Sequence, residues 1–513
     1  MSLQGLPREL LHRICAASAT PAIRSLRLVC SAVSAVADEH LKQNWNLYYL
    51  RDSLESAHRL DRPGILKGVK SLCFHADRLP YYPTYSDWVR KRKDFTFGHY
   101  SGFSDRERKL LQPEHGANRH HKTEAQGDLS ARQLAGAYDT YCKLYEDEAT
   151  LAVDGTMRDG LCALFKLAPR LDTVVVTVGD SGRKWASWRQ RAYQEAMVAA
   201  CGDEDPSQNQ YEALTETLLA AHDAQRKIRH LTAIELPPSF FAHTPETLEK
   251  FGQVLDELDY LELDLRIPFR EVAWSVFDDD DGAGEQHTML DNLNDGSLAR
   301  FVSRCRQTRT LILEHPILHG PDWKQTPLQA FVGSLTFPNL THLQIGGFAS
   351  TQKELGNFLL GHRMTLLKVQ MRHMCLTEGR WADLFAAISG RFPNIKRGAG
   401  STNFALRGHF SLTHRADEYW FADENDDEVD ALTRRMENYV RDSGVRPTTT
   451  DDMWHWPSDE ENSIHWMSDS ERSDSSGEEH SMDSDSETGS ASELGIGSEL
   501  TSLEGSEYNS ARW

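Results

Sequence analysis

Cysteine is scarce in this chain of 513 residues, and the cysteines present lie far apart. The eight stand at positions 15, 30, 73, 142, 162, 201, 305 and 375, without a Cys-x-x-Cys pair. This spacing argues against a disulfide framework and against a thiolate zinc site, because each needs clustered cysteines. We therefore expect a reducing compartment, the cytoplasm or the nucleus, and neither a metal nor another cofactor.

Long hydrophobic runs are missing as well. The longest strongly apolar stretch is VVVTV at 174–178, far below the roughly 20 residues that span a bilayer. Near the first residue, Pro7, Arg8 and Glu9 interrupt any apolar core of a secretory signal. The sequence thus predicts neither a membrane-spanning segment nor export.

Positive charge is outnumbered. The chain carries 56 Lys plus Arg against 77 Asp plus Glu, a formal net charge of -21. This balance opposes attraction to nucleic-acid phosphates and anionic lipids, which argues against both as partners. The last 57 residues, 457–513, hold 15 acidic residues, two arginines and 16 serines. Burial there cannot offset the entropy of ordering the chain, so we expect a disordered acidic tail.

Signatures of catalysis are absent too. The chain has no GxxxxGK[ST] phosphate loop, no HExxH and no GxSxG motif. GDSGR at 179–183 follows a predicted strand, as a glycine-rich turn does. DDDDGAG at 278–284 has Phe277 where a calcium loop needs a carboxylate. His315 and His319 have no thiolate or carboxylate partner at a matching interval. We expect no enzymatic activity.

What the chain does contain is a recurring pattern between residues 69 and 371: an apolar residue, two others, an apolar residue, one other, and a third apolar residue. The end of each match alternates with a period of two, which predicts a short strand with alternate side chains buried. The middle apolar residues of the matches are Leu72, Val174, Leu231, Leu261, Leu311, Leu343 and Val369. The shorter intervals between them, 26 to 32 residues, are typical of a repeat of strand, loop and helix.

Helical patterns lie between these strands. ETLEKFGQVLDEL at 246–258, for example, places apolar residues on one side of a helix. The alternation predicts an α/β fold with a mainly parallel sheet lined by helices, because parallel neighbours need a long crossover. The alternative is that the matches arise by chance in an ordinary α/β enzyme.

Residues 6–36 hold the most specific pattern. Leu6-Pro7 and Thr20-Pro21 each predict a helix start, since proline is tolerated in the first helical turn. A stripe of Leu10, Leu11, Ile14 and Cys15 follows the first start; Ile23, Leu26, Val29, Cys30 and Val33 follow the second. Two or three short helices are too few for a self-sufficient core, so this unit must dock on something. An ordinary helical hairpin that caps the repeats is the alternative.

LPRELLHRI followed by LRLVCSAV resembles the F-box, the helical motif by which substrate receptors attach to the adaptor of cullin-RING ubiquitin ligases. Further on, FPNLTHLQI and TLLKVQM resemble fungal F-box proteins with irregular leucine-rich repeats. The resemblance implies these adaptor-binding residues: Leu6, Pro7, Glu9, Leu10, Ile14, Leu26, Val29 and Cys30. Ser31, Ala32 and Val33 depart from the basic pair and aromatic residue of many members, which predicts weaker adaptor binding.

The sequence and this resemblance together predict four regions. They are an F-box-like helical unit over 1–45, an irregular leucine-rich-repeat-like α/β domain over 46–400 with a charged insertion at about 80–146, a helical extension over 401–456, and the tail over 457–513. The implied function is substrate recognition in an SCF-type ubiquitin ligase. The adaptor, and cullin through it, would bind the first unit and an unknown target protein the second. A scaffold outside the ligase, whose acidic tail binds basic partners, is the alternative.

In such a repeat the residues between the buried ones face the concave surface. The predicted target-binding residues are Tyr260, Glu262, Asp264, Glu314, His342, Gln344, Lys368, Gln370 and Arg372, with His230, Thr232, Thr310 and Ile312 on the same ladder. The middle of this ladder is acidic and its end basic, which predicts a partner of mixed charge. The alternative is that these are ordinary exposed strand residues.

Overall fold

The computed structural model describes residues 6–59, 63–95, 131–178, 195–196, 206–265, 296–315, 326–332, 335–395, 403–412, 419–421 and 430–442. Contacts divide the chain into two units, 1–452 and 453–513. All described residues belong to the first unit. The predicted boundaries after residues 45 and 400 fall inside this unit. The predicted acidic tail lies outside the described residues, as does much of the predicted charged insertion, 96–130.

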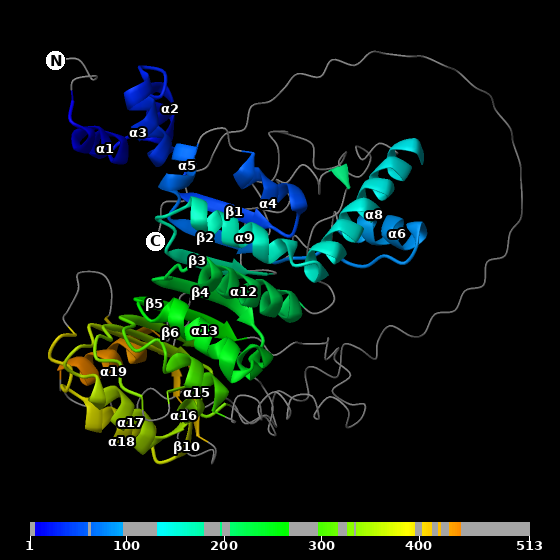
Figure 1. Ribbon diagram of the computed structural model, residues 1–513. Helices are drawn as coiled ribbons and strands as arrows, with labels where there is room; N and C mark the ends of the chain where they lie inside the picture. Colours follow the sequence, from blue (N-terminus) through cyan, green and yellow to red (C-terminus); the bar gives the residue numbers. More distant parts are fainter. Residues whose placement is uncertain are drawn as a thin grey trace, which may run out of the picture. The chain divides into compact units, whose positions relative to one another are not determined.

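A mainly parallel sheet organises the described part of the chain (Figure 1). Its principal strands are β1 (Asn44–Tyr48), β2 (Ser71–His75), β3 (Thr173–Thr177), β4 (His230–Leu236), β5 (Tyr260–Leu265), β6 (Thr310–Glu314), β7 (His342–Gly346), β9 (Lys368–Arg372) and β11 (Phe404–Leu412). They lie side by side in this order, each parallel to the next. The prediction of an α/β fold with a mainly parallel sheet is confirmed.

The register of the sheet matches the sequence repeat residue by residue. The seven middle apolar residues form one continuous row across the paired strands, extended by Trp45 in β1 and Phe404 in β11. A second row, two residues further along, runs from Leu47 to Leu406. Both rows are buried. A slip of one residue would expose a whole row to water, so burial holds the register.

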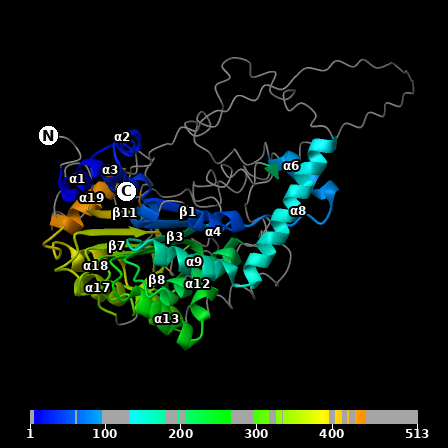
Figure 2. The same cartoon turned by 45° about the horizontal axis from the view of Figure 1, so that its top comes forward.

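Helices in the connections cover one face of this sheet (Figures 1 and 2). They are α4 (Arg51–His58), α9 (Thr156–Leu167), α12 (Pro206–Asp223), α13 (Pro245–Leu255), α15 (Ser297–Val302), α16 (Leu328–Val332), α17 (Gln352–Gly361) and α18 (Trp381–Ile388), with the 3-10 helix η3 (Pro238–Ala242) before α13. One continuous core lies between them and the sheet. Each described helix is too short or too polar to cross a bilayer.

Helix α13 illustrates how the sequence forms these covering helices. The Thr244 hydroxyl accepts a hydrogen bond from the Thr247 amide, and a proline occupies the first turn. Such a cap satisfies an amide that has no partner inside the helix. Phe251, Val254 and Leu255 then face the core. The predicted apolar stripe and the capped start therefore agree on the same helix.

The predicted charged insertion contributes two helices, α6 (Tyr85–Phe95) and α8 (Ala131–Val153). They share a separate small core, in which Trp88 is fully buried and Tyr141 nearly so. The Tyr141 hydroxyl donates to the Pro80 carbonyl at 2.8 Å and accepts from the Tyr82 amide at 2.9 Å. A buried phenol with both roles satisfied fixes this loop on α8.

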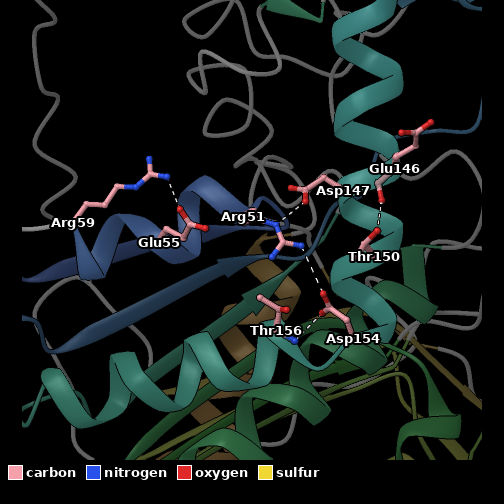
Figure 3. A network of polar contacts seen from close by, with 8 residues as sticks. All are labelled: Arg51, Glu55, Arg59, Glu146, Asp147, Thr150, Asp154 and Thr156. Atoms are coloured by element: carbon pink, nitrogen blue, oxygen red, sulfur yellow. Dashed lines mark hydrogen bonds and ion pairs between the residues drawn. The ribbon is translucent and has the colours of Figure 1, made fainter.

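We call the main sheet and the helices that cover it the sheet domain. An ionic junction joins α8 to this domain (Figure 3). Arg51 of α4 donates to Asp147 of α8 at 2.8 Å and lies 3.6 Å from Asp154. Asp154 accepts from the Thr156 amide at 2.8 Å, at the start of α9. Hydrogen bonds from Thr156, together with the charge of Arg51, hold the pKa of Asp154 below its ordinary value. Three helices thus meet at two carboxylates.

Residues 401–456 differ from the predicted helical extension. Residues 404–412 form strand β11 inside the sheet, and β12 (Tyr419–Phe421) pairs with it antiparallel. Among the described residues of this range, only α19 (Asp430–Asp442) is helical. Phe404, Leu406 and Phe410 stand at even spacing and are buried, which is the period of a strand. The expectation of helix at 404–412 is therefore wrong, because this period was overlooked beyond the last repeat match.

Two neighbouring repeats continue into a side sheet. β8 (Ala349–Thr351) and β10 (Cys375–Glu378) pair in parallel, and β10 also pairs with the end of β11. The chain steps out of the main sheet at Gly347 and, one repeat later, at His373, with φ of 77° and 46°. A Cβ at Gly347 would stand 2.0 Å from the His315 carbonyl oxygen, so only glycine fits there.

Candidate functional site

The amino-terminal region forms three helices, α1 (Arg8–Ala16), α2 (Thr20–Leu26) and α3 (Ser31–Leu41). Pro7 immediately precedes α1, and Pro21 lies in the first turn of α2. The two predicted helix starts are thus confirmed. The apolar residues at helical spacing beyond Pro21 fall in two helices and the turn between them, because Cys30 is extended and α3 begins after it. We call α1, α2 and α3 the N-terminal unit.

The N-terminal unit has a small core of its own. Its buried side chains are Leu11, Cys15, Ile23, Val33, Val36 and Ala37, and Leu6, Leu26 and Cys30 pack partly buried against them. None of these residues belongs to the core beneath the sheet. The predicted stripe therefore divides: Leu11 and Cys15 face inward, whereas Leu10 and Ile14 face outward.

Helix α3 attaches this unit to the rest of the chain. Gly68, at the end of α5 (Pro63–Gly68), approaches the Glu39 carbonyl so closely that a Cβ would stand 1.9 Å from its oxygen. The Glu39 carboxylate is 2.7 Å from Arg8 of α1 and 3.1 Å from Arg170, which precedes β3. Because Glu39 is buried, one carboxylate joins α1, α3 and the sheet domain.

Four large apolar side chains of the N-terminal unit remain exposed. Leu10 is 42 % exposed, Ile14 37 %, Leu28 87 % and Val29 45 %. They are four of the ten exposed large apolar residues in the described part of the chain. Leu10 and Ile14 stand one turn apart on the same side of α1. Single exposed apolar residues are ordinary, whereas a large contiguous apolar patch is typical of an interaction surface. We call these four the N-terminal apolar residues.

The predicted adaptor-binding residues fall into two groups. Pro7, Glu9, Leu10, Ile14 and Val29 are exposed, whereas Leu6, Leu26 and Cys30 are half-buried against the small core. Sequence reasoning missed Leu28, which is the most exposed of the ten exposed large apolar residues in the described part of the chain. It lies out of phase with the helical spacing, and the turn between α2 and α3 that displays it was not expected. The sequence did hold one signal for Leu28: a large apolar side chain next to Val29, a predicted adaptor-binding residue.

The predicted target-binding residues lie on the open face of the sheet, opposite the covering helices. The register sets them in three rows: Tyr260, Thr310, His342 and Lys368; Glu262, Ile312, Gln344 and Gln370; and Asp264, Glu314, Gly346 and Arg372. His230 and Thr232 extend the first two rows. In β5 the polar residues are half-buried and the leucines between them are buried, so alternation is complete.

Within these rows, Glu262 and Glu314 are not isolated charges. Glu262 accepts from the Tyr260 hydroxyl at 2.9 Å and from Thr232 at 3.0 Å. Burial, reinforced by Glu262, raises the pKa of Tyr260 above its ordinary value. Glu314 accepts from Gln344 and lies 3.6 Å from an Arg372 nitrogen. The acidic middle and the basic end of the ladder thus meet at Glu314 and Arg372.

The first row ends in two exposed basic side chains. His342 and Lys368 are register partners on β7 and β9, and both are exposed. Partial burial, with the charge of Lys368 as the next cause, lowers the pKa of His342. His342 therefore stays neutral at neutral pH. Lys368 supplies the positive charge of this row.

The other segments considered as catalytic or metal-binding sites show no such site among the described residues. His315 is buried and bonded to Thr326 at 3.1 Å, while His319, GDSGR and DDDDGAG lie outside the described residues. The residues that the structure describes contain no group of three metal-ligating side chains. A groove of about 700 Å³ lies between α13 and α15. Glu249 and Arg304, which both line it, pair at 2.5 Å.

Comparison with known proteins adds no relative. No protein-family model matches the chain, and no curated protein matches it. The arrangement of the described residues therefore has to carry the functional argument. It consists of a three-helix unit with exposed apolar side chains, attached to a parallel sheet whose open face is polar.

Proposed function

We propose that this chain is an F-box protein, the substrate-recognition subunit of an SCF-type cullin-RING ubiquitin ligase. The N-terminal unit binds the adaptor, and the irregular leucine-rich repeats of the sheet domain bind a target protein. Other subunits carry out ubiquitin transfer. The contribution of the chain is proximity, because holding a target lysine near the transferring enzyme turns a bimolecular encounter into a local one.

The observation that carries this proposal is the incomplete burial of the N-terminal unit. Its core is separate from the one beneath the sheet, and the N-terminal apolar residues stay between 37 % and 87 % exposed. A hairpin that merely capped the repeats would turn such side chains toward the sheet domain. Large apolar groups left in water favour a partner that covers them.

The sheet domain supports the second half of the proposal. Each strand from β2 to β6 pairs with its predecessor and its successor along the chain, as in a stack of repeats. The open face carries polar and aromatic side chains, among them Tyr260 and Lys368, on a rigid scaffold. Tyrosine and basic residues at such positions suit protein recognition.

Co-purification with the ligase adaptor tests the proposal. Leu10→Glu with Ile14→Glu should lower adaptor capture at least about 10-fold, because each charge replaces an apolar contact. The matched control is Leu367→Glu with Met364→Glu, which changes two similarly exposed apolar side chains outside the unit. Both variants must keep the thermal unfolding midpoint of the wild type for the comparison to hold.

Deletions separate the proposed receptor from the alternative scaffold. Removal of residues 1–41 should abolish adaptor capture, and removal of 457–513 should leave it intact. Capture that survives the first deletion would exclude the receptor proposal. Capture of basic proteins that needs only 457–513 would instead support the scaffold, because that segment carries 15 of the acidic residues.

A further inference from the structure

Strand β2 places a thiol against an imidazole. Cys73 and His75 are two residues apart on the strand, so their side chains point to the same, open face. Leu72 and Phe74, between and beside them, point into the core and are fully buried. The Cys73 sulfur lies 3.5 Å from His75 Nε2, within hydrogen-bond range for sulfur. Cys73 is half-buried and forms no disulfide.

The imidazole is held in this position by its neighbours. The Tyr48 ring stacks on it, with centroids 4.8 Å apart and planes inclined by 10°. His75 is only 4 % exposed, which limits rotation of its ring. The Tyr48 face also favours a cationic ring beside it, through its quadrupole. The stack therefore keeps Nε2 directed at the thiol and stabilises the protonated imidazole.

The register neighbours of the pair on the two adjacent strands are uncharged. They are Asn46 and Tyr48 on β1 and Val175 and Thr177 on β3, and none of them carries a formal charge at neutral pH. Asp77, two residues after His75, is buried as well. Burial costs both charges their solvation, but opposite charges in contact attract more strongly in a poorly solvated setting than in water, which offsets part of that cost. A proton transferred from sulfur to nitrogen leaves such a pair.

We propose that Cys73 and His75 form a thiolate–imidazolium pair and that Cys73 is a site of reversible oxidation by peroxide. The thiolate sulfur attacks one peroxide oxygen, forming an S–O bond as the O–O bond breaks. The leaving hydroxide takes the imidazolium proton and departs as water. Cysteine is thereby oxidised to a sulfenic acid and the peroxide is reduced; a thiol reductant restores the cysteine.

The first experiment measures the pH dependence of alkylation in the full-length wild type. Iodoacetamide is applied across a pH series, and each cysteine is followed by peptide mass spectrometry. The Cys73 rate should rise with a midpoint near pH 6 to 7, below the ordinary thiol value of about 8.5. Cys162 is the control because it is half-buried against the core. The midpoint does not depend on accessibility. A Cys73 midpoint equal to or above that of Cys162 would overturn the proposal.

The second experiment exposes the protein to hydrogen peroxide and traps sulfenic acid with dimedone. Cys73 should be labelled at peroxide concentrations that leave Cys162 unlabelled, and dithiothreitol added before the trap should remove the label. His75→Gln should raise the Cys73 alkylation midpoint by at least about one pH unit and lower labelling roughly 10-fold. Labelling of Cys73 that is equal in a His75→Gln variant with an unchanged thermal midpoint would also refute the pairing.

Discussion

The N-terminal unit and the sheet domain are built from similar apolar sequence, yet they bury it to different extents. In the sheet domain, Leu261 and Leu311 are fully covered, between strands on either side and helices beneath. In α1, Leu11 is 5 % exposed while the adjacent Leu10 is 42 % exposed. The sheet domain covers its apolar surface with its own helices, whereas the N-terminal unit leaves part of its apolar surface exposed.

This difference in burial indicates which region of the chain can unfold locally while the rest stays folded. Local stability follows local burial and contact density. The core of the N-terminal unit holds six buried side chains, and its attachment depends on the close approach at Gly68 and on the Glu39 carboxylate. We therefore expect the N-terminal unit to open independently, while the sheet domain unfolds as one block.

The largest effect separates the two regions directly. Leu311→Ala removes a fully buried side chain from the central row and should lower the free energy of unfolding by about 3–4 kcal/mol. Leu11→Ala, at the small core, should loosen only the N-terminal unit, with a global loss below about 1 kcal/mol. Urea denaturation followed by circular dichroism measures both. Equal global losses would show that the two regions unfold together, against this comparison.

The small core beneath α8 supplies the next test, through pH. Glu148 is 4 % exposed, and burial raises its pKa from 4.5 to about 8, although the Leu79 amide and Arg78 oppose the shift. The folded state therefore holds this proton more tightly than the unfolded chain does. The resulting stability is complete below pH 4.5 and is lost as the pH rises through 8.

Glu148→Gln removes this titration. The variant should gain stability relative to the wild type as the pH rises from 5 to 8, by about 1–3 kcal/mol. Thermal unfolding midpoints at several pH values measure the difference. Glu257→Gln, at an exposed position, is the control for the substitution itself. A difference between wild type and Glu148→Gln that stays constant with pH would contradict the raised pKa.

The sequence predicted different amounts of the structure in the sheet domain and in the N-terminal unit. It found the strand rows of the sheet domain, because a period of two in apolar residues survives in any half-buried strand. It missed β11, whose alternation of Phe404 and Leu406 follows no repeat match. In the N-terminal unit it found the helix starts at Pro7 and Pro21, because proline acts locally.

The details of both candidate surfaces depended on tertiary contacts. Which of Leu10 and Leu11 faces outward is decided by how α1 packs on α3, and a stripe four residues wide does not specify that. The attachment of Glu39 to Arg170 joins residues distant in sequence. The contact of Cys73 with His75, in contrast, had a local signal, since two residues on one strand share a face.

The attachment of the N-terminal unit gives the third prediction. Glu39→Gln weakens the ion pairs to Arg8 and Arg170, and should raise amide hydrogen exchange in residues 8–41 about 5-fold, roughly 1 kcal/mol, because both arginines are largely solvated. Exchange in β4 to β7 should not change. Hydrogen exchange with mass spectrometry measures both regions. Faster exchange in the strands as well would mean that the unit is part of the same cooperative block.

The smallest effect lies on the open face and separates structural from recognition residues. Arg372 lies 3.6 Å from Glu314 with both side chains about 30 % exposed, whereas Lys368 is exposed at the end of its row. Arg372→Ala should lower the free energy of unfolding by about 0.5–1 kcal/mol, and Lys368→Ala by less than about 0.3. Chemical denaturation measures both. Target capture should respond in the opposite order, because a side chain that is free to reorient can bind a partner without giving up an existing ion pair. Equal stability losses for the two variants would remove the distinction between a fixed acidic–basic contact and an available positive charge.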